Sequence, residues 1–239
     1  MEFEQNPRAR MDPYLSAHAA RYDLLLAKVR ELAPPNPRIL DVGPSYEGAR
    51  LRSLPATVDS LGFRDERFLP GEGEQHVQFD LRDAERTELW PQLADYDLVV
   101  CAEVIEHLPI SPVHVLRLLG TALRPRGWLV LQTPNAARLS NRLRLLAGRN
   151  PFEPLREDSV NPGHVREYTV SELLEMARKA DLEVGGWLTA DYFATGSRAN
   201  SVVRGLGPLV PRFLRAGITA WFRKPPRTRP EPPRRTPAT

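Results

Sequence analysis

The sequence predicts an α/β protein built on a parallel, doubly wound sheet. Short β-branched, apolar stretches alternate along the chain with stretches of helical spacing, the pattern of a parallel sheet covered by helices. The first such stretch ends at Gly43, and the fourth runs directly into a cluster of acidic and imidazole side chains. Open α/β sheets bind their ligands at the carboxyl ends of strands. With 239 residues, 41% of them hydrophobic, the chain fits one such domain better than two.

The predicted elements follow one another at regular spacing. A helix is expected from Asp12-Pro13, an N-cap followed by proline at the first helical position, to about Leu32. Thr169 and Glu172 form the capping box of a helix over residues 170–179. Shorter helices are expected over 48–54 and 112–123, and strands over 38–43, 56–63, 75–80, 96–101, 127–133, 182–188 and 217–222.

Composition limits the class of protein. The one cysteine, Cys101, excludes an intramolecular disulfide and favours a cytoplasmic location, and its place at the end of an apolar strand predicts a buried side chain. No uninterrupted run of 18 apolar residues and no signal-peptide pattern is present, so no membrane span is expected. The formal net charge is only +3. Residues 1–12 are expected to be flexible and 225–239 to form a disordered basic tail, which leaves 13–224 as the domain.

The turn after the first strand, from Ile39 to Gly48, is a candidate ligand site. Gly43 and Gly48 would allow bare backbone to approach a nucleotide. The turn lacks the Gly-x-Gly-x-x-Gly dinucleotide fingerprint, which disfavours a nicotinamide-dependent oxidoreductase. By itself, a strand–glycine–helix turn is also common packing.

The segment from Cys101 to Pro109 holds the densest group of reactive side chains. Glu103, Glu106 and His107 stand at i, i+3 and i+4, so one helical turn would place all three on one face. That group could supply a general base or bind a cation, or the two glutamates could simply favour the positive end of a helix dipole. His164 follows an Asn-Pro-Gly loop and is a candidate site residue only if it lies beside Glu106 and His107.

Together these stretches resemble class I S-adenosylmethionine (SAM) dependent methyltransferases. Five motifs match in order, from the Ile39–Gly48 turn through 79–81, 96–107 and 127–135 to 163–169. The resemblance implies a Rossmann-like, seven-stranded sheet whose last strand is antiparallel, with SAM as cofactor. It places Asp41, Gly43 and Gly48 at the amino-acid end of SAM, with Ser45 where the family has its second glycine.

The resemblance also implies positions for the rest of the cofactor. An acidic residue after the second strand would meet the ribose, and Asp65 is preferred to Asp59 for this role. Asp80, with Leu81 beside it, would meet the adenine amino group, although an Asx-turn at a strand end explains a lone aspartate equally well. Glu103 is expected beside the cofactor as well.

Within the family, two branches are similar to this chain. One comprises ubiquinone-type O-methyltransferases. The other comprises small-RNA 3′-terminal 2′-O-methyltransferases, whose Glu-x-x-Glu-His motif and later histidine bind a divalent metal. The resemblance to the second branch implies Mg, Mn, Fe or Co on four ligands, which here would be Glu103, Glu106, His107 and His164. A metal-free role of His107 as the base, assisted by Glu106, and a purely structural role remain open.

The acceptor is expected under residues 136–161, an insertion between the fifth strand and the capping box. Arg138, Asn141 and Arg142 are candidates to meet an anionic acceptor, and Tyr14, Arg21 and Tyr22 could cover the cofactor. The predicted function is O-methylation of a hydroxyl on a small molecule or sugar-containing metabolite. The alternatives are a metal-dependent RNA 3′-terminal 2′-O-methyltransferase, made less favourable because no aromatic stacking platform is visible, and a degenerate fold that only binds.

Overall fold

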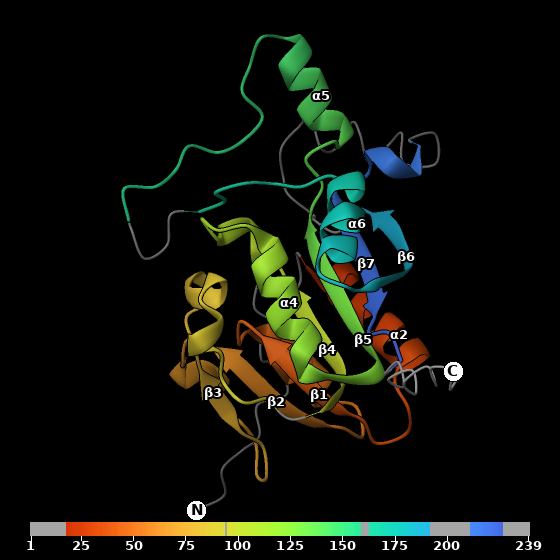
Figure 1. Ribbon diagram of the computed structural model, residues 1–239. Coiled ribbons are helices and arrows are strands. Elements are labelled where there is room, and N and C mark those ends of the chain that lie inside the picture. The colour runs from red at the N-terminus through yellow and green to blue at the C-terminus, as the bar shows by residue number, and fades with distance from the viewer. Residues whose placement is uncertain (1–17, 94, 159–162, 192–210, 227–239) are drawn as a thin grey trace, which may run out of the picture.

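The computed structural model describes residues 18–93, 95–158, 163–191 and 211–226 (Figure 1). The expectations for the N-terminus 1–12, for Tyr14 and for most of the basic tail lie outside the described residues. Within them, seven strands form one sheet in the order β3-β2-β1-β4-β5-β7-β6. The strands are β1 (Arg38–Val42), β2 (Thr57–Gly62), β3 (His76–Gln78), β4 (Tyr96–Ala102), β5 (Leu123–Pro134), β6 (Glu183–Ala190) and β7 (Gly217–Arg223).

The pairing confirms the predicted fold class. Strands β1 to β5 are parallel to one another, and β7 is antiparallel to both β5 and β6. The last strand is therefore inserted antiparallel between β5 and β6, as expected for a Rossmann-like sheet of this kind.

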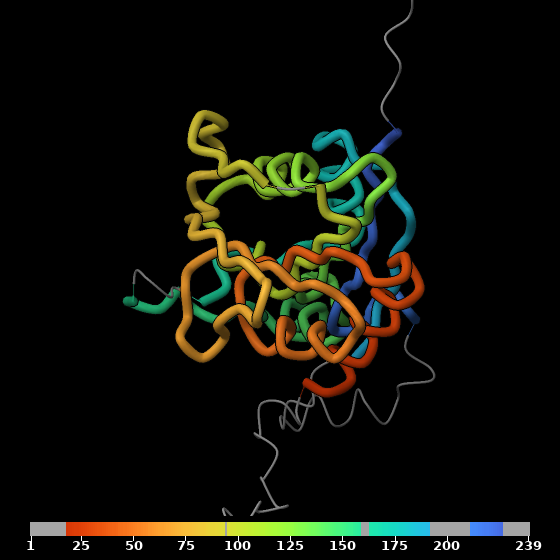
Figure 2. The backbone as a smooth tube through the Cα atoms, turned by 90° about the horizontal axis from the view of Figure 1, so that it is seen from below, coloured from red at the N-terminus to blue at the C-terminus, as the bar shows by residue number. Residues whose placement is uncertain are grey.

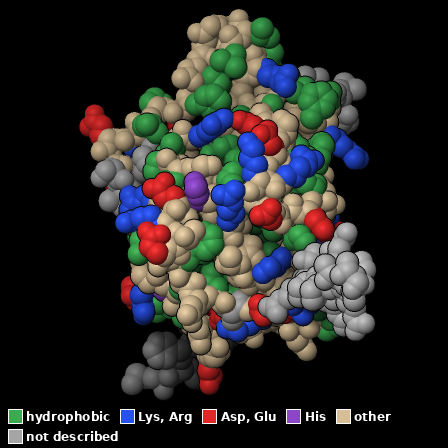
Figure 3. All heavy atoms as spheres, in the orientation of Figure 1, with side chains coloured by type: hydrophobic (Ala, Val, Ile, Leu, Met, Phe, Trp, Pro, Cys, Tyr) green, Lys and Arg blue, Asp and Glu red, His purple; other side chains and the backbone are tan. Residues whose placement is uncertain are grey.

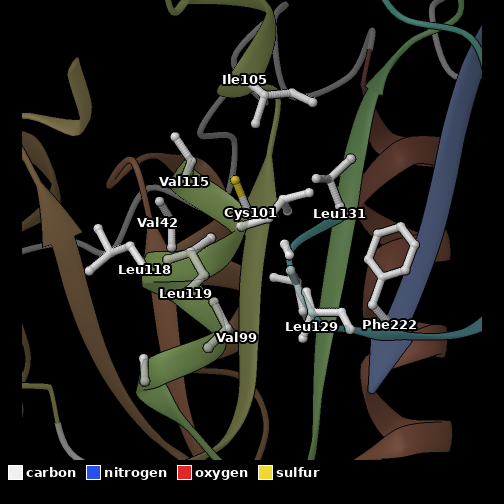
Figure 4. Close-up of a cluster of buried hydrophobic side chains, with 14 of the residues drawn as sticks. Val42, Val99, Cys101, Ile105, Val115, Leu118, Leu119, Leu129, Leu131 and Phe222 are labelled. Carbon is white, nitrogen blue, oxygen red and sulfur yellow. The ribbon is translucent and has the colours of Figure 1, made fainter. Parts of the chain in front are cut away.

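Helices cover both faces of the sheet (Figure 2). One core packs α4 (Pro112–Ala122) and α6 (Val170–Lys179) against the sheet, and the other packs α2 (Ala19–Leu32) and α3 (Tyr46–Leu51). Strand β4 shows why both faces are apolar: Val99 and Cys101 enter the first core, whereas Leu98 and Val100 enter the second. Figure 4 shows Cys101 within the first core, where 1% of the side chain is exposed, so its predicted burial is confirmed.

Two predicted elements differ from the structure. Helix α3 begins at Tyr46 rather than Gly48, because Ser45 is already its N-cap. Strand β5 begins at Leu123 rather than Gly127, because Leu123 pairs with Tyr96 across a register shift in β4. The capping box of α6 is confirmed: the Thr169 hydroxyl accepts from the backbone N–H of Glu172, whose carboxylate accepts from the N–H of Thr169.

The helical turn predicted over residues 103–107 is wrong. Only Ile105–His107 (η4) is helical, as a single 3₁₀ turn, and Glu103 has φ +55°. The backbone N–H of Glu103 still donates to Gln132 on β5 at 2.9 Å, so the sheet pairing holds this residue out of a helix. Glu103 therefore does not share a helix face with Glu106 and His107.

The sheet order places a crevice at the centre of the molecule. Strand β1 lies between β2 and β4, and the chain leaves it toward α3 on one face and leaves β4 toward α4 on the other. Such a reversal of strand order separates the loops at the carboxyl ends and leaves room for a ligand.

Candidate active site

A cavity of about 820 Å³ lies at the carboxyl ends of β1, β4 and β5. This volume is within the range of pockets that bury a drug-sized molecule. Its walls come from the turn after β1, from the segment after β4, from the end of β5 and from residues 138–156. The two ends of the cavity differ in chemistry. One end is lined by the carboxylates of Glu47 and Glu103 with the guanidinium of Arg21. The other end is lined by histidines, arginines and Phe152.

The turn after β1 needs its glycines. Gly43 has φ +76°, and a Cβ atom there would lie 2.9 Å from Cγ2 of Val104. A Cβ atom at Gly48 would lie 2.7 Å from Oδ2 of Asp41. Asp41 is buried beneath the turn, and burial, followed by the charge of Glu47, raises the pKa of its carboxyl group well above the usual range. The turn therefore packs directly on a carboxylate.

Arg21, Glu47 and Glu103 form a charged group at this end of the cavity. The Arg21 guanidinium is 1% exposed; its Nη2 donates to Glu47 and its Nη1 lies 3.8 Å from Glu103 Oε1. Four buried atoms of the group have no hydrogen-bond partner among the described residues, namely Arg21 Nε and Nη1, Glu47 Oε2 and Glu103 Oε1. Buried polar atoms are normally paired, so this end of the cavity fits a ligand that carries both donors and acceptors.

The charge balance favours a cationic ligand. Within the part of the chain that the structure describes, Arg21 is the arginine whose charge acts on Glu47, Glu103 and the nearby buried Glu106. Burial raises the pKa of Glu103 to about 7 against the opposing charge of Arg21. Burial also raises the pKa of Glu47, again against Arg21. A bound cation would stabilise the ionised carboxylates and offset the free-energy cost of burying their charge.

The turn η4 is held by the segment that carries His164. The backbone oxygen of Glu106 accepts from Val165 at 2.7 Å and from Arg166 at 3.1 Å. Gly163, with φ +80°, makes the bend before that segment. These bonds bring the His164 ring to 4.9 Å from the His107 ring, between centroids, although 56 residues separate Gly163 from His107.

The hydrogen bonds define the tautomer of His107. Its Nδ1 lies 2.9 Å from the carbonyl oxygen of Gly163, which can only accept, so Nδ1 carries the proton. Nε2 is then the nitrogen with a free lone pair, in a side chain that lines the cavity. Burial is the main reason that the pKa of His107 is lowered, which favours the neutral ring.

His164 is oriented by a buried acidic residue. Its Nδ1 lies 3.4 Å from Oε1 of Glu167, whose other oxygen accepts from Asn141 at 3.3 Å. Burial alone would raise the pKa of Glu167, but the bond from His164 and the charge of Arg138 lower it. Glu167 therefore remains ionised beside His164.

Three of the four expected metal ligands lie together. One ligand atom each from Glu106, His107 and His164 falls within 4.8 Å of the others, whereas Glu103 is turned toward Arg21. Glu106 is fully buried; its Oε2 accepts from Thr133 and its Oε1 is unpaired. An orphaned carboxylate oxygen beside two imidazoles fits a divalent cation, so metal binding stays a prediction with a reduced ligand set.

The expected cofactor residues divide into two groups. Gly43, Ser45 and Glu103 line the cavity. Asp41 and Gly48 lie behind its wall, and Leu81 is part of the core. These roles remain predictions.

Asp65 and Asp80 are each engaged by the arginine two residues later. Asp65 accepts from the backbone and guanidinium of Arg67, and Asp80 from those of Arg82. Each therefore forms an Asx-turn at a strand end. Neither carboxylate lines the cavity, and contact with a ribose or an adenine would require the arginine to release it.

Asp59, the less favoured ribose candidate, has a structural role. It is fully buried in β2 and accepts from Arg38 Nη2 at 2.6 Å, Gln75 N at 2.8 Å and Tyr96 Oη at 2.9 Å. We expect Asp59→Ala to lower the free energy of unfolding by about 3 kcal/mol, because donors on three residues, Arg38, Gln75 and Tyr96, lose their partner. Urea unfolding followed by circular dichroism measures this. Asp65→Ala is the control, expected to unfold at the same urea concentration as wild type because its partner Arg67 is exposed.

The acceptor end differs in part from expectation. Arg138 lines the cavity, but Asn141 is buried against Ala136 and Glu167, and Arg142 bonds to the backbone of Ala137. Tyr22 belongs to the core. The sequence reasoning missed further lining residues, which are Glu47, Arg144, Phe152, Arg156 and Glu167. Glu47 carried a signal as an acidic residue between the two glycines of the first turn, and Arg144, Phe152 and Arg156 lie within the insertion 136–161 under which the acceptor was expected.

A seven-stranded sheet with an antiparallel last strand and a cavity at the β1–β4 crevice defines a class of nucleotide-cofactor enzymes. A family model described as a methyltransferase domain matches residues 14–185, more than half of the chain. The chain therefore belongs to this family of class I SAM-dependent methyltransferases.

Individual relatives are more distant. A ubiquinone biosynthesis O-methyltransferase of Burkholderia pseudomallei is 26% identical over 159 residues, which are 63% of this chain and 66% of that protein. A protein of Mycolicibacterium smegmatis, named as a probable S-adenosylmethionine-dependent methyltransferase, is 32% identical over 59% of this chain and 49% of its own length. The chain thus spans between half and two thirds of the length of these relatives.

Solved structures share the fold at low identity. The 1,6-didemethyltoxoflavin-N1-methyltransferase of Burkholderia thailandensis, solved with S-adenosylhomocysteine, has a TM-score of 0.54 and 16% identity over 90% of this chain and 81% of that one. No helix within the described residues is long and apolar enough to cross a membrane.

Proposed function

We propose that this protein transfers a methyl group from SAM to a hydroxyl of a small molecule or sugar-containing metabolite. The observation that carries the proposal is the position of His107, whose free Nε2 belongs to a side chain in the same cavity as Arg21, Glu47 and Glu103, each of which has a buried polar atom without a hydrogen-bond partner among the described residues. A base and a zwitterion-binding group in one cavity are what such a transfer needs.

The charged end suits the amino-acid part of the donor. Arg21 would hold the carboxylate through its free Nε and Nη1, and Glu47 and Glu103 would accept from the ammonium group. The excess of carboxylates also favours a sulfonium. When bound, the donor supplies an already electrophilic methyl group, so the chain's residues have only to position the acceptor and remove its proton.

His107 would take that proton. A hydroxyl placed between Nε2 and the methyl group would lose its proton to Nε2 as its oxygen forms the new C–O bond, while the methyl C–S bond of the donor breaks and its electron pair goes to sulfur, leaving a neutral thioether. The Gly163 carbonyl accepts a hydrogen bond from Nδ1 and so orients the ring. The imidazolium that forms would keep this hydrogen bond. The similarity to a ubiquinone O-methyltransferase supports oxygen as the methylated atom.

A second candidate is metal-assisted methylation of a vicinal diol, as at an RNA 3′ end. It is favoured by one observation, the grouping of Glu106, His107 and His164 within 4.8 Å. A divalent cation held there would act as a Lewis acid toward a hydroxyl. Glu106 Oε1 and the two Nε2 atoms would hold it.

Transfer of labelled methyl groups from SAM into separate pools of metabolites, glycans and short RNA tests the proposal. We expect label in a metabolite or glycan pool and none in RNA. Dialysis against a chelator, followed by assay with and without Mn²⁺, separates the two candidates: retained activity supports His107 as a base, and activity restored only by the ion supports the metal site. Label in no pool, from a protein that binds S-adenosylhomocysteine, contradicts the proposal and favours a binding-only fold.

A further inference from the structure

Helix α5 (Leu139–Leu146) exposes its apolar side chains. Its one buried residue is the polar Asn141, which donates to Ala136 and Glu167. Leu143, Leu145 and Leu146 are 52%, 59% and 85% exposed. Helices of globular proteins normally bury the apolar stripe and expose the polar face, and this helix does the reverse.

Neighbouring segments extend the apolar area. Arg144 Nη1 donates to the carbonyl of Pro151, which holds the chain after α5 against the helix, and Asn135 donates to the backbone of Phe213 in η6 (Arg212–Leu214). Of ten exposed large hydrophobic side chains among the described residues, six lie here. We call these six the α5 surface: Leu143, Leu145, Leu146, Phe152, Leu155 and Phe213. Figure 3 shows hydrophobic and basic side chains side by side over this end of the molecule. Exposed apolar side chains gathered in this way are typical of an interaction site.

The charge around the α5 surface is positive. From Leu139 to Phe152 the chain has three arginines, Arg142, Arg144 and Arg149, and no acidic residue. Acidic residues appear only after Phe152, where Glu153 pairs with Arg156 and Glu157 and Asp158 are exposed, so the positive charge belongs to α5 and the chain up to Phe152. The partner should therefore offer negative charge together with an apolar layer.

An anionic bilayer offers both over the whole length of α5. A two-fold contact of α5 with α5 would instead bring arginines against arginines, with no carboxylate between Leu139 and Phe152 to pair with them. At a bilayer, leucine and phenylalanine enter the acyl boundary while arginines bind lipid phosphates. We propose that the α5 surface docks this protein on an anionic lipid bilayer.

Docking would also orient the cavity. Leu139, Ser140, Arg144 and Phe152 belong to the same segment and line the cavity. The cavity mouth would therefore face the lipid headgroups. Docking itself does not depend on methyl transfer, so it can be tested without any acceptor.

Sedimentation of the full chain with vesicles tests the proposal. Wild-type protein is expected to sediment with vesicles of phosphatidylcholine and phosphatidylglycerol, and not with pure phosphatidylcholine. The double variant Leu143→Ser/Leu146→Ser should bind at least tenfold more weakly, and Arg149→Glu should weaken binding about tenfold. The matched controls are Leu69→Ser/Leu89→Ser and Arg178→Glu, which change exposed residues elsewhere and should bind as wild type.

Thermal unfolding of each variant verifies that it is folded, since Leu143 and Leu146 are exposed and their loss should leave the melting temperature within a few degrees. Wild-type binding by the folded double serine variant would overturn the proposal and assign membrane affinity to another segment, such as the basic residues 225–239. Absence of wild-type binding would overturn it too. So would a wild-type dimer, seen by sedimentation velocity, that the double serine variant dissociates, because the occupant would then be a second copy.

Discussion

Arg21→Met is expected to weaken the binding of S-adenosylhomocysteine at least a hundredfold. The methionine keeps the apolar stem but removes the guanidinium that pairs with Glu47 and Glu103 among the described residues. A ligand carboxylate would lose its charged donors, and two buried carboxylates would lose their counter-charge. A hundredfold loss corresponds to about 2.7 kcal/mol, within reach of one charge-assisted pair. Isothermal titration calorimetry measures the affinity.

Two further variants make this result specific. Arg21→Lys keeps the charge without the planar fork and should recover part of the affinity. Arg50→Met removes a partly buried arginine of α3 that lies over Tyr22 and does not line the cavity, so it should bind as wild type. The loss of the buried pair should also lower the free energy of unfolding of Arg21→Met by about 3 kcal/mol. If folded Arg21→Met bound S-adenosylhomocysteine with unchanged affinity, the assignment of Arg21 to the cofactor site would be contradicted.

His107→Ala is expected to reduce the methyl-transfer rate by about a thousandfold while S-adenosylhomocysteine binds within a few-fold of wild type. General-base catalysis contributes about 10² to 10⁴ in rate, and His107 is not part of the Arg21 group that would hold the cofactor. Single-turnover transfer of labelled methyl groups measures the chemical step directly. His114→Ala, on α4 and outside the cavity, is the matched control and should retain full activity.

His164→Ala distinguishes the two roles of His107. If His107 is a metal-free base, the loss of its neighbour should cost less than about tenfold, because Nδ1 of His107 is held by Gly163 rather than by His164. If both imidazoles hold a cation, the two alanine variants should be equally inactive. Normal turnover by His107→Ala would exclude both roles.

The sheet was predictable because its strands are buried on both faces. Continuous apolar runs such as 98–101 are typical of a strand buried on both faces, and each core takes alternate residues of the same strand. The capping box of α6 is a local signal, read from Thr169 and Glu172 alone. Local sequence patterns of these kinds predict the structure correctly because they do not depend on contacts with distant segments.

The site was less predictable because its contacts join distant segments. The ion pair of Arg21 and Glu47 spans 26 residues and has no local pattern. Glu103 was assigned to a helix by its spacing, but a backbone bond to β5 decides its conformation. The reversed polarity of α5 also escaped notice, because what makes it unusual is the burial of Asn141 by Glu167, 26 residues further along.

A crystal structure of the complex with S-adenosylhomocysteine tests the central claim most directly. We predict the homocysteine carboxylate on Arg21, its amino group between Glu47 and Glu103, and its sulfur on the side of the cavity that holds His107. A ligand whose amino-acid end avoids Arg21, or whose sulfur points away from His107, would contradict both the assigned cofactor site and the proposed base.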